Sequence, residues 1–141
     1  MTRWTRNALR GLMLILLLRG TKPAHAEYMR IHLRVYGLDC GICARGVSAS
    51  IGRLAGVEGV KVNLQSGMLD ITLARGNRLK LSDLRKRVRE NGFRSLEATV
   101  TAIGRFSGSG FEVLGSGESY AVGRASQSGA SDPVELTFHV R

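Results

Sequence analysis

Residues 37–43 read Gly37-Leu38-Asp39-Cys40-Gly41-Ile42-Cys43 and contain the only two cysteines of the chain. This stretch lies between an alternating strand pattern and a helical pattern. Two residues between cysteines allow both sulfur atoms to reach one point, which is either a soft metal ion or the other sulfur. The stretch therefore predicts a metal site or a disulfide, held on a loop between a strand and a helix.

Apolar periodicity on both sides of this loop predicts the neighbouring elements. Alternation over residues 31–36 is typical of a half-buried strand. Beyond the loop, apolar residues at helical spacing from Cys43 to Leu54 predict a helix that Gly56 stops. Two alternating segments, 60–64 and 69–73, then flank a turn and predict a β-hairpin.

A second helix is expected after this hairpin, with Ser82 as its N-cap and Asn91-Gly92 as its stop signal. A fourth strand is expected from Phe93. The resulting order, βαββαβ, predicts an α+β fold: a ferredoxin-like sandwich in which two helices cover an antiparallel sheet.

The rest of the chain predicts a Gly/Ser-rich β extension. From Gly104 to Ser131, 14 of 28 residues are Gly or Ser, which is typical of loops and long turns. Strand-like pieces persist at 98–103, 111–114 and 120–122, and residues 134–140 alternate cleanly. We expect the fourth strand to run on into a small antiparallel extension, residues 99–141, of unknown role.

The N-terminus has the features of a secretory signal. A basic segment precedes seven apolar residues from Leu12 to Leu18, and Ala24-His25-Ala26 offers a small-x-small cleavage pattern. Seven apolar residues are too few to span a bilayer, which takes about 20. We expect residues 1–26 to be a cleaved signal peptide and the mature chain to be periplasmic, without stable insertion in the membrane.

The net charge of +10 falls once this segment is removed, because 16 basic and 11 acidic residues leave +5. Neither interleaved aromatic residues nor a recognition-helix pattern accompanies the basic residues, so we expect no nucleic-acid partner.

Residues from about 29 to 98 resemble the heavy-metal-associated domain family, which includes mercury-binding periplasmic proteins, copper chaperones and the N-terminal modules of metal-exporting ATPases. We expect this domain to span residues 27–98. The matching residues are Gly37, Cys40, Cys43, Val47, Leu54, Gly56, Val57, Val60, Val62, Leu64, Gly67, Ile71, Gly92 and Phe93. The resemblance implies a metal-binding protein that captures one thiophilic ion through Cys40 and Cys43, for transfer or sequestration. It also implies a membrane metal transporter or pump as the partner.

Cys43 is expected at the N-terminus of the first predicted helix. The helix dipole there and the nearby Arg45 would both favour the thiolate form of Cys43. Two thiolates on a loop suit Cu(I) or Hg(II).

The family usually has methionine where this chain has Leu38, an apolar exchange that should keep the packing role. Asp39 stands where threonine is commoner, and it resembles the variant of zinc-, cadmium- and lead-exporting pumps. As a third ligand Asp39 would favour Zn(II), Cd(II) or Pb(II). Alternatively, Asp39 is a solvated loop residue or caps the helix.

Other candidate residues have ordinary explanations. Phe93 either shields the thiolates, as the resemblance implies, or packs in the core. His32 and His139 fall on the outward phase of their strands, and we interpret both as ordinary surface residues. The basic residues of the second helix and the loop before it form a solvated surface or dock an acidic partner; they are Arg75, Arg78, Lys80, Arg85, Lys86 and Arg87.

Two other functional classes remain open. Cys-Gly-x-Cys resembles the motif of thioredoxin-type thiol-disulfide oxidoreductases. That family has tryptophan before the cysteine pair and a cis-proline later in the chain. The mature chain here has no tryptophan, and its only proline, Pro133, lies near the terminus. A noncatalytic interaction domain with an ordinary disulfide is the other alternative, because an oxidising compartment promotes disulfides. No other motif suggests catalysis, and we expect the protein not to be an enzyme.

Overall fold

The computed structural model describes residues 27–108, 110–122 and 134–141. In chain order the elements are β1 (Tyr28–Tyr36), α2 (Gly41–Gly52), β2 (Val57–Asn63), β3 (Met68–Leu73), α3 (Leu81–Glu90), β4 (Arg94–Ser107), β5 (Gly110–Val113), β6 (Glu118–Ala121) and β7 (Val134–Val140). The predicted signal segment lies outside the described residues. Within the described part of the chain, no helix is long and apolar enough to cross a membrane.

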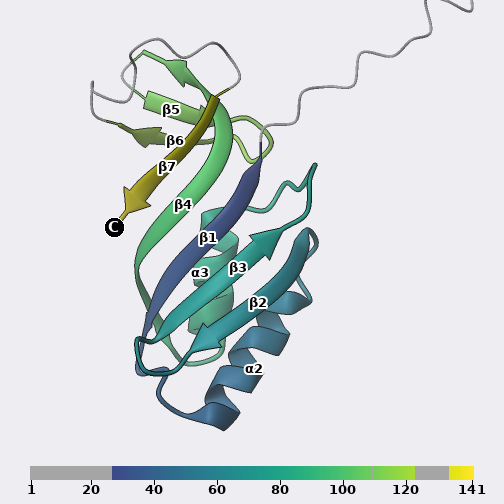
Figure 1. Cartoon of the computed structure of the whole chain (residues 1–141), viewed down its shortest axis with the longest axis vertical. Helices are drawn as coiled ribbons and strands as arrows, with labels where there is room; N and C mark the ends of the chain where they lie inside the picture. The colour runs from purple at the N-terminus through teal and green to yellow at the C-terminus, as the bar shows by residue number, and fades with distance from the viewer. Residues whose placement is uncertain (1–26, 109, 123–133) are drawn as a thin grey trace, which may run out of the picture.

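All paired strands of the sheet are antiparallel, and their order is β2-β3-β1-β4-β5-β6, with β7 also paired to β4. Helices α2 and α3 lie on the same side of this sheet and leave its other face open (Figure 1). The predicted α+β, ferredoxin-like arrangement with a β extension is confirmed.

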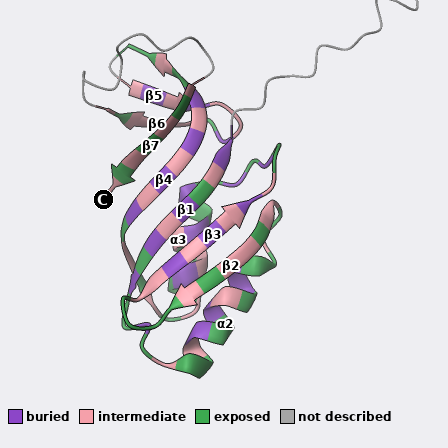
Figure 2. Cartoon of the chain, viewed as in Figure 1, coloured by how far each residue is buried: buried purple, intermediate pink, exposed green. Residues whose placement is uncertain are grey.

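The core lies between the sheet and the two helices. Alternation along β1 buries Ile31, Leu33 and Val35, and its intervening residues are more exposed (Figure 2). From the helices, Val47, Ile51, Leu84 and Val88 meet this face. Burial of each such side chain stabilises the fold by about 1.5–3 kcal/mol.

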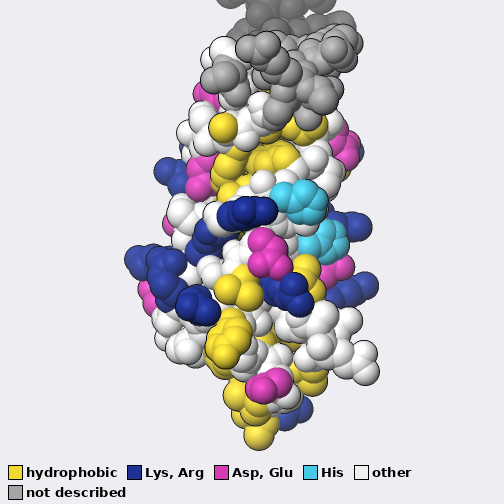
Figure 3. Space-filling view, turned by 90° about the vertical axis from the view of Figure 1, so that its left-hand side faces the viewer, with side chains coloured by type: hydrophobic (Ala, Val, Ile, Leu, Met, Phe, Trp, Pro, Cys, Tyr) yellow, Lys and Arg dark blue, Asp and Glu magenta, His cyan; other side chains and the backbone are white. Residues whose placement is uncertain are grey.

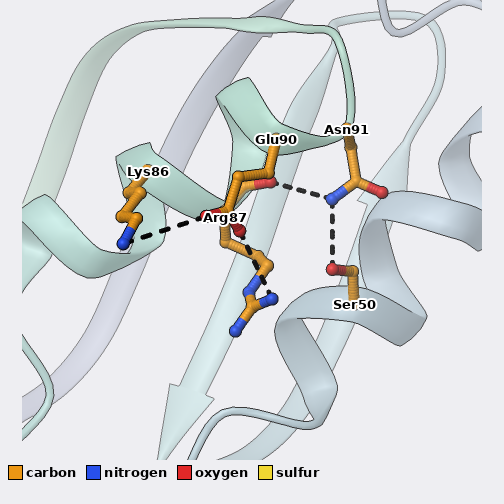
Figure 4. Close-up of polar contacts among 5 residues, drawn as sticks. All are labelled: Ser50, Lys86, Arg87, Glu90 and Asn91. Carbon is orange, nitrogen blue, oxygen red and sulfur yellow. Dashed lines mark hydrogen bonds and ion pairs between the residues drawn. The ribbon is translucent and has the colours of Figure 1, made fainter.

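Contacts near the C-terminal end of α3 join the two helices (Figure 4). The Nδ2 of Asn91 donates to Ser50 Oγ on α2, at 3.1 Å, and to the carbonyl oxygen of Arg87, at 2.8 Å. Glu90 pairs with Lys86 at 3.9 Å and with Arg87 at 3.3 Å. These ion pairs lie within α3 and contribute only about 0.3–0.5 kcal/mol each. Of the polar contacts in this group, the hydrogen bond from Asn91 to Ser50 is the one that joins the two helices.

The N-terminus of α3 differs from the prediction. Lys80, not Ser82, is the N-cap residue. The carboxylate of Glu118, from β6, accepts hydrogen bonds from the backbone N–H of Leu81 at 2.8 Å and of Ser82 at 3.5 Å. A carboxylate distant in sequence therefore accepts from the first backbone N–H groups of the helix.

Glu118 also joins the β extension to the start of β1. The Tyr28 hydroxyl donates to Glu118 at 2.5 Å and lies 2.7 Å from the Tyr120 hydroxyl. Burial and the hydrogen bond to Glu118 raise the pKa of Tyr28, and burial raises the pKa of Tyr120 to about 12. Both tyrosines therefore stay protonated and neutral at physiological pH.

Apolar residues of the extension continue the core of the sandwich. Phe138 of β7 meets Phe111 and Tyr120, with ring centroids 5.6 and 5.0 Å apart, and Phe111 is fully buried. Strand β4 runs through both parts of the chain, and the predicted division between residues 98 and 99 falls inside it. The extension thus shares a strand and a hydrophobic core with the sandwich.

Candidate metal centre

The loop between β1 and α2 is anchored by one apolar side chain. Gly37 turns the chain with a φ of 78°, and Leu38 is then 2% exposed. The packing role predicted for Leu38 is confirmed. With Leu38 buried, the next residues are held at the end of the sandwich, at the N-terminus of α2.

Both cysteines are half-buried free thiols at this helix end. Helix α2 begins at Gly41 instead of Cys43, and Cys40 is its N-cap, with φ −105° and ψ 125°. The Cys40 sulfur accepts a hydrogen bond from the backbone N–H of Cys43, at 3.4 Å. Cys43 lies in the first turn and packs partly against the core. The first cysteine therefore faces the N–H groups of the helix end.

The pKa values of the two thiols move in opposite directions. The pKa of Cys40 is lowered, first by the hydrogen bond from the Cys43 thiol and then by the backbone N–H groups of Cys43 and Ile42. The pKa of Cys43 is raised, chiefly because its thiol donates to the Cys40 sulfur. The thiolate is thus favoured at Cys40, whereas the sequence had indicated Cys43. The main cause is the hydrogen bond from the Cys43 thiol, and the backbone N–H groups at the start of the helix add to it.

Cys40 is expected to react with iodoacetamide faster than Cys43 near pH 7, because the thiolate is the nucleophile and a lowered pKa enlarges its fraction. Peptide mass spectrometry after brief labelling of the reduced protein measures both rates. The Cys40 rate should also persist to lower pH. Asp39→Asn should accelerate both reactions, since the charge of Asp39 raises both thiol pKa values. Equal rates at the two cysteines would contradict this assignment.

Asp39 is exposed on the loop beside Cys40. The helix cap proposed as one of its roles is instead provided by Cys40. Among the residues that the structure describes, no three His, Cys, Asp or Glu side chains are grouped so as to hold a metal ion. Coordination by Asp39 stays a prediction.

Exposed hydrophobic residues surround the cysteine loop. In the described part of the chain, the large hydrophobic side chains that are exposed are Tyr36, Ile42 and Leu64, at 66, 74 and 42%. Tyr36 precedes the loop, Ile42 lies between the cysteines, and Leu64 faces a groove of about 390 Å³ that the loop also lines. Hydrophobic side chains gather at this lower end of the molecule (Figure 3). The thiols therefore lie beside an apolar surface.

Phe93 is half-buried and packs against the hydrophobic core, which confirms the core role. Its predicted shielding of the thiolates stays a prediction.

Several of the basic residues lie away from the cysteine loop. A cavity of about 620 Å³ beyond the C-terminal end of α2 is lined by Arg75, Arg78, Lys86 and Arg87, together with Asp83 and Glu90. The docking of an acidic partner there also stays a prediction.

Comparisons with known proteins identify the family. Residues 32–94 match the heavy-metal-associated domain. The copper chaperone CopZ of Bacillus subtilis (strain 168) is 31% identical over 61 residues, which are 43% of this chain and 87% of that protein. The chain belongs to the heavy-metal-associated domain family.

Matches to solved structures also cover about half of this chain. A CopZ metallochaperone is 22% identical with a TM-score of 0.45, and the match covers 48% of this chain and 98% of that one. Oxidized MerP from Ralstonia metallidurans CH34 is 23% identical with a TM-score of 0.45, over 49% of this chain and 94% of that one.

Proposed function

We propose that this protein binds one thiophilic metal ion between Cys40 and Cys43 and transfers or sequesters it without catalysing a reaction. The observation that carries the proposal is the pairing of two free thiols at the helix end, with the pKa of Cys40 lowered by donors from Cys43 and Ile42. A metal ion that displaces the shared proton gains two sulfur ligands at a preformed helix terminus.

Cu(I) is the ion we infer first. Thiolates select soft ions, and two of them satisfy the coordination of Cu(I) or Hg(II). The B. subtilis relative is a copper chaperone, which supports the same choice. Zn(II), Cd(II) and Pb(II) are the alternative, and they depend on a third ligand from Asp39.

Transfer is supported by the position of the thiols. They lie on a loop at the end of the molecule, beside Tyr36, Ile42 and Leu64, which are exposed. An apolar surface around a site fits transient docking of a second protein, whose own thiols then take the ion. We infer a membrane metal transporter or pump as that partner.

The periplasm is the compartment we propose, on the basis of the signal features in residues 1–26. Cleavage after Ala26 would leave Glu27 as the first residue. The backbone carbonyl of Glu27 accepts a hydrogen bond from the N–H of Ile103 at 2.9 Å, so the sandwich holds this residue directly. Mass spectrometry of the protein from the periplasmic fraction tests the cleavage: a chain that retains residues 1–26 would contradict it.

The thiol pair also favours a second candidate, thiol-disulfide exchange, because a lowered pKa at the first cysteine is a feature of Cys-x-x-Cys redox proteins. One experiment separates the two functions. Reduced protein is titrated anaerobically with Cu(I), Hg(II), Zn(II) and Cd(II), and is then assayed for insulin reduction. The proposal predicts tight one-to-one metal binding and no catalysed insulin reduction. Catalysed reduction without metal binding would favour the redox protein, and neither activity would favour an interaction domain.

Asp39→Ala tests the choice of metal. If the carboxylate is a ligand, the variant loses affinity for Zn(II) and Cd(II) more than for Cu(I) and Hg(II), because ions that seek four ligands depend more on a third one. Loss of the charge also lowers the pKa of Cys40, which favours binding of every ion. We expect the Zn(II):Cu(I) affinity ratio to fall at least tenfold, about 1.4 kcal/mol, in competition titrations.

Glu58→Ala is the matched control, because it removes an exposed carboxylate from β2, away from the loop. It should leave the Zn(II):Cu(I) ratio unchanged. Equal changes for all four ions in Asp39→Ala would exclude coordination by this residue.

A further inference from the structure

The cavity beyond the C-terminal end of α2 has the size of a small-molecule site. Its volume is about 620 Å³, and it is formed by residues 54–56 after α2, residues 74–79 before α3 and one face of α3. Pockets for small ligands typically measure about 300–1,000 Å³. Helix α2 runs from the cysteine loop to this cavity, and its 12 residues separate the two by roughly 18 Å (Figure 1).

Hydrogen bonds and close packing hold the wall of the cavity in place. Asn77 is 6% exposed, and its Nδ2 donates to the carbonyl oxygens of Ala74 at 2.7 Å and of Tyr28 at 2.8 Å. The N–H of Ala74 in turn donates to the carbonyl oxygen of Gly56 at 2.9 Å. A Cβ on Gly56 would lie 2.6 Å from Asn77 Cβ, so the two turns pack directly against each other. A wall that is fixed before binding lowers the entropy cost of binding.

The side chains around the cavity carry an excess of positive charge. Glu90 is paired with Lys86 at 3.9 Å and with Arg87 at 3.3 Å (Figure 4). Arg75 and Arg78 are exposed, and neither has an ion-pair partner among the residues that the structure describes. In total, four cationic and two anionic side chains line the cavity, which leaves two positive charges uncompensated: Arg75, Arg78, Lys86 and Arg87, with Asp83 and Glu90.

We propose that this cavity binds a phosphate-bearing anion through the guanidinium groups of Arg75 and Arg78. A guanidinium group donates two parallel hydrogen bonds to phosphate oxygens. A terminal phosphate group offers three acceptor oxygens and nearly two negative charges, so it can engage both arginines and match the excess charge. A single carboxylate has two oxygens and one charge. The ligand is either a free organic phosphate or the terminal phosphate of a lipid headgroup. This site is independent of the function proposed for Cys40 and Cys43.

The test uses the full chain without added metal, at low ionic strength because salt screens exposed charges. Pyrophosphate is titrated by calorimetry and, in parallel, into ¹⁵N-labelled protein observed by NMR. We expect one pyrophosphate per chain, weaker binding of the dicarboxylate succinate, and shift changes centred on residues 54–56 and 74–79. Vesicles of phosphatidylcholine, with and without phosphatidic acid, identify the source of the phosphate: binding that requires phosphatidic acid, without binding of pyrophosphate, assigns the site to a lipid headgroup.

Arg75→Gln and Arg78→Gln should each weaken binding of the phosphate probe by about fivefold or more. Glu90→Gln should strengthen it, because this change removes an acidic group from the same cavity. Arg89→Gln is the matched control, since Arg89 is an exposed arginine of α3 that does not line the cavity. It should leave the affinity unchanged, and circular dichroism should show that all variants are folded.

Three results would overturn the proposal. The first is an equal loss of affinity in Arg89→Gln, or no loss in Arg75→Gln and Arg78→Gln. The second is succinate binding as tight as that of pyrophosphate. The third is a failure to bind both pyrophosphate and vesicles with phosphatidic acid, or shift changes centred away from residues 54–56 and 74–79.

Discussion

Serine at either Cys40 or Cys43 is expected to abolish tight one-to-one binding of a thiophilic ion. One thiolate cannot chelate, and a serine hydroxyl is a poor ligand for a soft ion. We expect the affinity for Cu(I) to fall at least a hundredfold, about 2.8 kcal/mol, in anaerobic competition with a chromophoric chelator. The loss should be similar in the two variants, because each removes one of two sulfur ligands.

Stability should change little in these variants, since both side chains are only half-buried and the buried anchor of the loop is Leu38. Ser48→Ala, in the same helix, is the control that should bind Cu(I) as the unmodified protein does. Retained affinity in both cysteine variants would place the metal elsewhere.

Gly104→Ala is expected to give the largest loss of stability among small changes in the sheet. Gly104 lies in β4 where the aromatic ring of Phe111 crosses it, and an added Cβ would lie 2.6 Å from Phe111 Cζ and against the carbonyl oxygen of Glu112. Phe111 is fully buried and the carbonyl belongs to the backbone, so neither gives way easily. We expect the free energy of unfolding in urea to fall by about 1–3 kcal/mol.

Gly59→Ala is the control for this prediction. Gly59 also lies in a strand, but a Cβ there would meet no atom within 4 Å. Its replacement should be neutral or stabilise the protein by up to about 1 kcal/mol, because alanine reduces the entropy of the unfolded chain. Equal urea midpoints for the two variants would show that Phe111 does not pack against Gly104 as described.

Local patterns were sufficient to predict most elements of the fold. Strict alternation around Ile31 and over residues 134–140 identified strands, because the side-chain period of a strand is visible in sequence. The hairpin turn before Met68 and the stop of α3 at Gly92 depend on neighbouring residues alone, and both were predicted. The loop with Cys40 and Cys43 was also predictable, since its two cysteines are close in sequence.

Features that join distant segments were not predictable in this way. The N-terminus of α3 receives Glu118 from β6, and nothing near Ser82 in the sequence indicates that carboxylate. His32 and His139 lie on either side of Thr99 because β1 and β7 both pair with β4, and the sequence does not indicate this register. The preference for a thiolate at Cys40 depends on the hydrogen bond from the Cys43 thiol and on a helix start two residues before Cys43. The positions of helix ends are poorly specified by periodicity.

X-ray absorption at the copper edge tests the central claim most directly. The reduced protein is loaded anaerobically with one equivalent of Cu(I), without thiol-containing buffer. Coordination by Cys40 and Cys43 predicts a first shell of two sulfur atoms, and this shell should be lost in Cys40→Ser. A first shell of nitrogen or oxygen atoms, or an unchanged sulfur shell in Cys40→Ser, would contradict the assignment of the metal site to this loop.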